Sequence, residues 1–193
     1  TIMRTRERKD VAPEHNQGMK VVPQILTKDA DDFLNISNVL LELGYDEINL
    51  NLGCPASTVV TKGKGAGFLA EPNRLDAFFD QVFCELDKRR MNQSLHISVK
   101  TRLGMEEADE FWNLLEIYNR YPFSELILHP RVQKDLYRNT PRRDVYGKAM
   151  QESKCPVCYN GDIFSKKDYE EFVKQYSQTT SVMLGRGIIA NPG

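Results

Sequence analysis

Short apolar runs alternate with longer stretches of helical periodicity along most of this 193-residue chain. The runs have the composition of buried strands and lie at 21–26, 48–52, 97–103, 126–131, 157–163 and 182–186. The segments between them carry apolar stripes at helical spacing, as at Phe33, Ile36 and Leu40 in the stretch 29–43. Strands that alternate with helices pair in parallel through βαβ units, so the sequence predicts an α/β fold.

Two parallel architectures fit this pattern, a doubly wound open sheet and a (β/α)8 TIM barrel. The barrel is favoured because polar residues stand at the ends of many strands, whereas an open sheet concentrates its site near one switch point. These residues are Asn51, Cys54, Lys100, Arg102, His129, Arg131, Asn160, Asp162 and Arg186. A barrel has eight strands over about 250 residues. We therefore expect a truncated barrel with about six of its eight strands.

Length and composition restrict the class of protein further. A chain of 193 residues suits one domain, and its formal charge is only −1. No apolar run approaches membrane-spanning length, and no secretory signal opens the chain. The pair Cys155 and Cys158 has CxxC spacing, but no second CxxC or histidine pair accompanies it. We interpret the pair as structural, expect no metal, and expect a reducing, cytoplasmic location.

The run that begins at Ile48 ends in an unusual group of side chains. Strand alternation places Asn49 and Asn51 on the face opposite Ile48, and amides need polar partners when they are buried. Cys54 follows at the carboxyl end, where it could be a buried apolar thiol, a nucleophile or a proton donor. The later glycine-rich stretch 63–67 lacks the spacing of a dinucleotide-binding fingerprint.

Cationic residues recur at the other strand ends. Lys100 and Arg102 share one strand face, and two cations inside a barrel repel each other unless an anion lies between them. Next to them, His129 becomes a site candidate rather than a structural histidine. The turn Gly185-Arg186-Gly187 resembles a barrel phosphate site, and Asn160-Gly161-Asp162 could complete it.

A basic cluster lies in the connection after the fourth predicted strand. It comprises Arg131, Lys134, Arg138, Arg142 and Arg143. Such clusters are usually solvated loops, but they can also contact phosphates.

Six ordered motifs resemble those of the tRNA-dihydrouridine synthases. They lie at 49–55, 63–69, 99–104, 129–131, 160–163 and 185–187, so the likeness runs from about Gln24 to Pro192. The resemblance implies an FMN-dependent (β/α)8 barrel that reduces the C5–C6 double bond of uridines in tRNA. NADPH would recharge the flavin.

The resemblance also implies roles for individual residues. Cys54 would be the general acid that protonates C5 of uracil, after hydride transfer from the flavin to C6. FMN would be held by Gln24, Lys100, His129, Asn160, Gly161, Asp162, Gly185 and Arg186. The substrate would be bound by Asn51, Arg102 and Arg131. The target uridine must leave its stack to reach a buried flavin.

The likeness leaves out the family's first strands and its C-terminal helical tRNA-recognition domain. We therefore expect residues 1–193 to form a single catalytic barrel domain, with tRNA as partner, no membrane association and no evident stable protein partner. Three alternatives stay open at this point. They are an FMN barrel that reduces a free pyrimidine or an enone, a flavin-free tRNA-binding module, and a phosphate-sugar isomerase or lyase.

Overall fold

The computed structural model describes residues 3–89 and 94–190 of the chain. In these residues one parallel sheet is formed, and its strand order follows the sequence. The strands are β1 (Gln24–Ile25), β2 (Glu47–Leu52), β3 (His96–Arg102), β4 (Glu125–His129) and β5 (Val157–Tyr159). Sequential parallel neighbours are the product of consecutive βαβ units. The predicted α/β class is therefore confirmed, and the arrangement is consistent with part of a TIM barrel.

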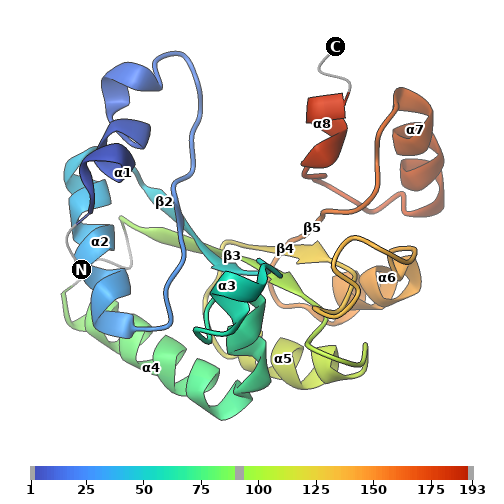
Figure 1. Ribbon diagram of the computed structural model, residues 1–193, viewed down its shortest axis with the longest axis horizontal. Helices are drawn as coiled ribbons and strands as arrows, with labels where there is room; N and C mark the ends of the chain where they lie inside the picture. The colour runs from blue at the N-terminus through green and yellow to red at the C-terminus, as the bar shows by residue number, and fades with distance from the viewer. Residues whose placement is uncertain (1–2, 90–93, 191–193) are drawn as a thin grey trace.

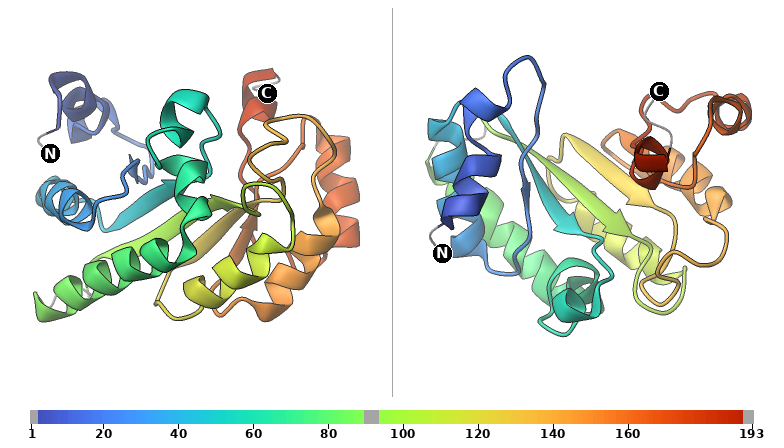
Figure 2. Two further views of the ribbon diagram at one scale, coloured as in Figure 1. Left: turned by 60° about the horizontal axis from the view of Figure 1, so that its bottom comes forward. Right: turned by 45° about the horizontal axis from the view of Figure 1, so that its top comes forward.

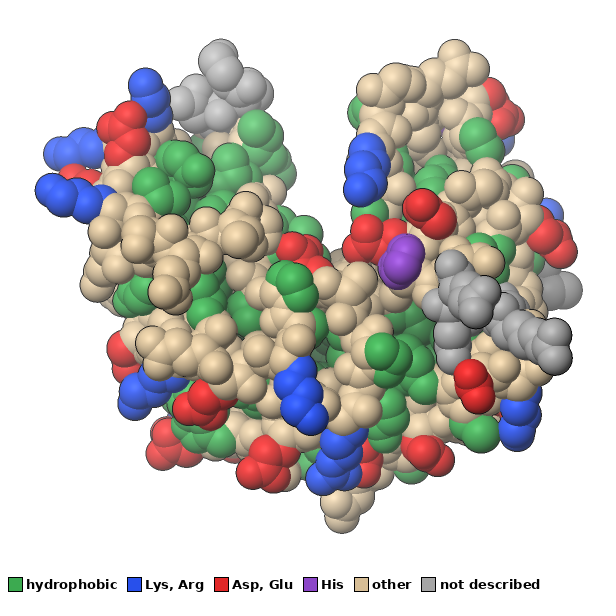
Figure 3. All heavy atoms as spheres, turned by 180° about the vertical axis from the view of Figure 1, so that it is seen from behind, with side chains coloured by type: hydrophobic (Ala, Val, Ile, Leu, Met, Phe, Trp, Pro, Cys, Tyr) green, Lys and Arg blue, Asp and Glu red, His purple; other side chains and the backbone are tan. Residues whose placement is uncertain are grey.

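Helices cover the outer side of the curved sheet, as Figures 1 and 2 show. The longer ones are α2 (Ala30–Glu42), α4 (Pro72–Lys88), α5 (Glu110–Tyr118), α6 (Arg143–Glu152) and α7 (Lys166–Gln175). The shorter ones are α1 (Thr5–Asp10), α3 (Ser57–Val60), α8 (Arg186–Ala190) and the 3-10 helices η1 (Pro13–His15) and η2 (Gly65–Ala70). Seen from behind, the molecule is hollowed between the part that carries α1 and the part that carries α8 (Figure 3).

The two faces of the sheet differ in chemistry, as strand alternation predicts. Ile48, Leu50 and Leu52 of β2 are each 0% exposed and belong to the apolar core under the helices. On the opposite face of the same strand lie Asn49 and Asn51. Burial of the apolar face stabilises the sheet by roughly 25 cal/mol per Å² of apolar area removed from water. The polar face is left for the cavity described below.

The predicted strand over 182–186 is wrong in extent. The structure has there a single parallel bridge between Tyr159 and Val182. The ladder stops because the side chain of Asn160, rather than a backbone amide, donates to the carbonyl of Met183 (2.8 Å). The predicted strands at 126–131 and 157–163 also end early, at His129 and Tyr159. The strand predicted at 21–26 begins only at Gln24, since proline at position 23 has no N–H for the ladder.

The helix starts follow the sequence signals. Asp29 accepts a hydrogen bond from the Asp32 amide (2.8 Å) and caps α2. Ser165 and Asp168 form a capping box at the start of α7. Among the described residues, no helix is both long and apolar enough to cross a membrane.

Candidate functional site at the carboxyl ends of the strands

A cavity of about 290 Å³ lies where the polar strand ends converge. Ten of the twelve predicted site residues line it: Gln24, Asn51, Cys54, Lys100, Arg102, His129, Asn160, Gly161, Gly185 and Arg186. The remaining two, Arg131 and Asp162, lie behind this lining and bond to His129 and Arg186. The predicted residues, which are spread over more than 160 positions of the chain, thus meet at one site.

A chain of amide hydrogen bonds links the first three strands on the polar face. Asn49 donates to the Ser98 hydroxyl (3.0 Å), and Gln24 donates to the side-chain oxygen of Asn49 (2.7 Å). Asn51 donates in turn to the Gln24 side-chain oxygen (2.7 Å). Each amide has a partner, which removes the cost of placing it inside the fold. These bonds also fix the orientation of the Gln24 and Asn51 side-chain amides.

Cys54 is held in place through its backbone. Its amide and that of Gly53 both donate to the side-chain oxygen of Asn51, each at 3.0 Å. The carbonyl of Cys54 accepts from the amide of Ala66 (3.0 Å). Gly65 has φ +56°, and a Cβ there would lie 2.8 Å from the Cys54 carbonyl oxygen. This glycine lets the glycine-rich stretch approach the backbone of Cys54 closely. The stretch packs against Cys54 and fixes the position of this half-buried thiol.

Two cations from β3 face the cavity but differ in their surroundings. Arg102 is buried and donates to the carbonyls of Gly53 (2.8 Å) and Val132 (3.1 Å). Lys100 is half-buried, and its ammonium has no hydrogen bond or ion pair within the described part of the chain. Burial, with the nearby charge of Arg102, lowers the pKa of Lys100 to about 8. An unpaired cation of this kind suits an anionic or electron-rich ligand edge.

The depressed pKa of Lys100 gives an expected pH dependence of stability. The unfolded lysine keeps its proton up to about pH 10.5, whereas the folded one releases it near pH 8. The unfolded state therefore binds more protons between these values, and the free energy of unfolding attributable to Lys100 should rise across that window. We expect a rise of about 1 to 3 kcal/mol, measured by urea unfolding at each pH. Lys100→Met should remove the rise, and Lys148→Met, an exposed lysine on α6, should retain it. Equal profiles for Lys100→Met and the unmodified protein would contradict the assignment.

His129 is neutral in this site. Burial and the charge of Arg102 lower its pKa to about 3. Its Nδ1 lies 2.5 Å from the carbonyl oxygen of Asn160, which can only accept, so Nδ1 carries the proton. Nε2 is then an acceptor and lies 3.4 Å from a guanidinium nitrogen of Arg131. His129 thus joins β4 to the residues after β5 and contributes no positive charge.

Asp162 lies between two arginines. Both its oxygens accept from Arg131, and Oδ1 also accepts from Arg186 at 2.6 Å. Burial raises the pKa of Asp162, but the hydrogen bonds and charge of Arg131, with the charge of Arg186, outweigh it, so the pKa lies below its usual value. Arg131 is 1% exposed, which makes its pairing with Asp162 a largely buried ion pair. Arg131 therefore faces the protein interior and not solvent.

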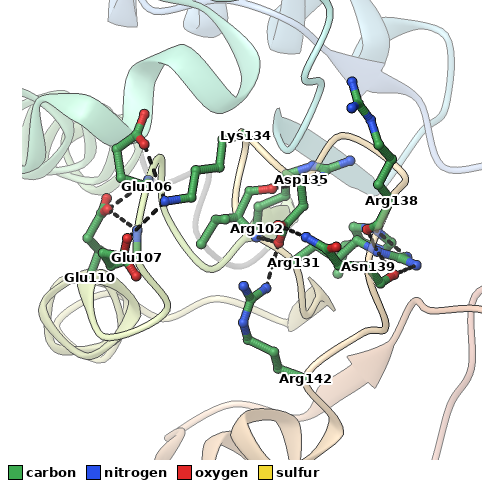
Figure 4. A network of polar contacts seen from close by, with 12 residues as sticks. Arg102, Glu106, Glu107, Glu110, Arg131, Lys134, Asp135, Arg138, Asn139 and Arg142 are labelled. Atoms are coloured by element: carbon green, nitrogen blue, oxygen red, sulfur yellow. Dashed lines mark hydrogen bonds and ion pairs between the residues drawn. The ribbon is translucent and has the colours of Figure 1, made fainter.

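The predicted basic cluster divides into paired and outward-pointing members (Figure 4). Lys134 pairs with Glu107 (2.8 Å) and Arg142 pairs with the buried Asp135. Arg138 is exposed, and its side chain points away from this network. Its guanidinium is the member of the cluster best placed to meet an external phosphate.

Tyr137 and Phe164 line the cavity and were not among the predicted site residues. Tyr137 is 55% exposed, and the guanidinium groups of Arg102 and Arg186 lie over its ring, 5.5 Å and 4.7 Å from the centroid. The signal that could have found Tyr137 is its position inside the basic cluster, since aromatics among cations are typical of nucleic-acid contacts.

The cysteine pair at 155 and 158 stands outside this cavity. Both are free thiols; Cys158 is buried in β5 and Cys155 is half-buried just before it. No group of three metal-ligating side chains is found in the part of the chain that the structure describes.

The fold and the cavity define a β/α-barrel-type protein whose site lies at the carboxyl ends of its parallel strands. The model of the dihydrouridine synthase family matches residues 1–193, and the chain belongs to that family. The chain is 31% identical over 167 residues to a probable tRNA-dihydrouridine synthase of Staphylococcus aureus, covering 84% of this chain and 48% of that protein. It is 29% identical over 188 residues to the tRNA-dihydrouridine(16) synthase of Pseudomonas putida, covering 94% of this chain and 56% of that protein. The chain thus spans about half the length of the curated relatives it matches.

Proposed function

We propose that this chain carries the catalytic site of an enzyme that reduces uridine to 5,6-dihydrouridine in tRNA, with FMN as cofactor and NADPH as reductant. The observation that carries the proposal is the convergence of Cys54, the unpaired Lys100 and Arg186 on one cavity, in a chain of the dihydrouridine synthase family. A tRNA substrate also favours the cytoplasmic location expected from the sequence.

The donors around the cavity fit FMN in chemistry. The amide of Gln24 is suited to the pyrimidine edge of the flavin, and the Lys100 ammonium to the edge that carries negative charge when the ring is reduced. Arg186, with Gly185 before it and Asn160 and Gly161 beside it, is suited to the phosphate end. When bound, FMN supplies the hydride that C6 of uracil receives. His129, as a neutral residue, would help to shape the site between these two ends.

Cys54 is proposed as the proton donor for C5. Its Sγ would carry the proton, and its backbone is fixed from both sides by Asn51 and by the loop at Ala66. Proton donation by a positioned group contributes typically 10²–10⁴-fold to a rate. The resulting thiolate regains a proton from water. Asn51 would hold Cys54 and face the uracil at the same time.

Contacts with tRNA are proposed for the loop after β4. Arg102 would bind the substrate from inside the cavity, while Arg138 would meet the phosphate backbone from outside. Arg131 is buried, so its part in substrate binding would be to hold the backbone at Arg138 and Asn139, to which it donates. The target uridine would be drawn out of its stack into the cavity.

The test is to measure dihydrouridine by mass spectrometry in tRNA from cells that lack the gene for this chain. We expect dihydrouridine to be lost at one or more positions and restored by the intact gene. Unchanged dihydrouridine at every position would overturn the tRNA assignment. A purified full-length protein that retains no flavin would instead overturn the assignment of FMN.

A further inference from the structure

Arg131, Asp162, Arg186 and Tyr137 form a circuit of contacts at the edge of the cavity, which is closed through the backbone that follows Tyr137. Arg131 donates to the carbonyls of Arg138 (2.9 Å) and Asn139 (2.6 Å), the two residues after Tyr137. The same guanidinium bonds Asp162, and Asp162 accepts from Arg186. The circuit is completed by Arg186 and Tyr137, whose guanidinium and ring centroid are 4.7 Å apart.

The loop that carries Tyr137 is held by the side chain of Asp135 within it and by Arg131 from outside it. Leu136 has φ 53° and Asn139 has φ 61°, a conformation that costs energy for residues other than glycine. Asp135 bonds the amide of Val132 and the side chain of Asn139 from one side. Arg131 holds the carbonyl of Asn139 from the other. Because strained backbone persists only when its surroundings hold it, the loop conformation depends on Arg131 and on what fixes Arg131.

The role of Asp162 follows from its position in the circuit. A carboxylate bonded to two guanidinium groups is ionised, and a direct contact with a phosphate would be repulsive. A guanidinium has five N–H donors, and the bond to Asp162 uses one Nη of Arg186. Arg186 therefore keeps donors for an anion while Asp162, Tyr137 and Phe164 fix the plane of its guanidinium.

We propose that Asp162 is a positioning residue that couples Arg186 to the loop 135–139, so that a phosphate monoester bound by Arg186 also fixes Tyr137 at the cavity. The identity of that phosphate as the one of FMN rests on the proposed function. The coupling itself rests only on the circuit of contacts. Through this coupling, the position of Tyr137 at the cavity depends on whether an anion is bound at Arg186.

The coupling is tested by hydrogen exchange, read by mass spectrometry on peptides that cover 133–139. Arg186→Gln leaves the pair of Arg131 and Asp162 intact and should still accelerate exchange in this loop, by about tenfold. Asp162→Asn should do the same or more. Arg120→Gln, which removes an exposed arginine that pairs with Asp76, is the matched control and should leave the loop unchanged. Exchange at the unmodified rate in Arg186→Gln would overturn the coupling, even if Asp162→Asn proves poorly folded.

Flavin titrations test whether the coupling responds to the phosphate of a bound flavin. The probes are FMN and riboflavin, which differ only in the phosphate. The unmodified protein should bind FMN more tightly than riboflavin. Arg186→Gln should reduce the ratio of the two dissociation constants by about tenfold. Tyr137→Leu should also reduce this ratio of dissociation constants, although a tyrosine ring is no phosphate ligand. Equal weakening of both flavins by Tyr137→Leu would overturn the coupling, because it would mean simple contact with the flavin ring. If neither flavin binds the unmodified full-length protein, the proposed function fails, and the exchange result alone decides the coupling.

Discussion

Replacement of Cys54 by alanine is expected to lower the rate of dihydrouridine formation by about 10²–10⁴-fold. The reason is that, in the proposed function, Cys54 gives the proton that C5 of uracil receives, and alanine has none to give. Gln24, Lys100 and Arg186 are untouched, so the affinity for FMN should change by less than about twofold. The measurement is single-turnover conversion of an unmodified tRNA by the flavin-loaded enzyme, with NADPH oxidation followed in parallel.

The matched control for this substitution is Cys84→Ala, since Cys84 is exposed on α4 and lies outside the cavity. It should turn over as the unmodified enzyme does. Wild-type rates in Cys54→Ala would remove the thiol from the acid role. Loss of both flavin binding and turnover would instead indicate that the Cys54 side chain supports the packing of the site, since alanine keeps the backbone bond to Ala66. The two readouts therefore separate a chemical role from a structural one.

The sequence predicts the sheet well because its physical basis is local. Alternation along β2 puts Ile48 and Leu50 in the core and Asn49 on the polar face whatever the neighbouring strands are. Where a strand ends depends on its neighbours, and this could not be predicted. The run at 182–186 contains strand-forming residues. The side chain of Asn160, however, donates a hydrogen bond to the carbonyl of Met183, and the ladder stops at Val182.

The site was predictable to the extent that parallel strands bring their carboxyl ends together. Lys100 and Cys54 could be assigned to one cavity for that reason alone. The partners of individual charges could not be assigned, because they depend on loop conformation. In the sequence, Arg131 is one more member of a basic cluster. In the structure, the backbone turn at Asn139 folds around its guanidinium and buries it. Tyr137 was missed for the same reason, since an unusual turn at Leu136 presents its ring to the cavity.

The burial of Arg131 leads to the largest expected effect on stability. Arg131→Met keeps the unbranched stem of the side chain but leaves Asp162 without its bidentate partner and two loop carbonyls without their donor. Removal of one member of a buried ion pair costs about 3–5 kcal/mol. We expect a loss of that size in the free energy of unfolding, measured by urea denaturation at neutral pH.

Arg120→Met tests whether burial is the cause. Arg120 pairs with Asp76 at 2.6 Å, but its side chain is 54% exposed, so the pair is screened by water and should contribute less than about 1 kcal/mol. Replacement of the arginine by methionine should therefore lower the free energy of unfolding slightly at position 120 and strongly at position 131. Equal losses would mean that Arg131 is no more than another surface charge, in conflict with its 1% exposure. Because Arg131 holds the pKa of Asp162 below its ordinary value, the stability that this pair contributes is present at neutral pH and is lost as the pH falls below the ordinary pKa of an aspartate, so the excess loss at position 131 should shrink there.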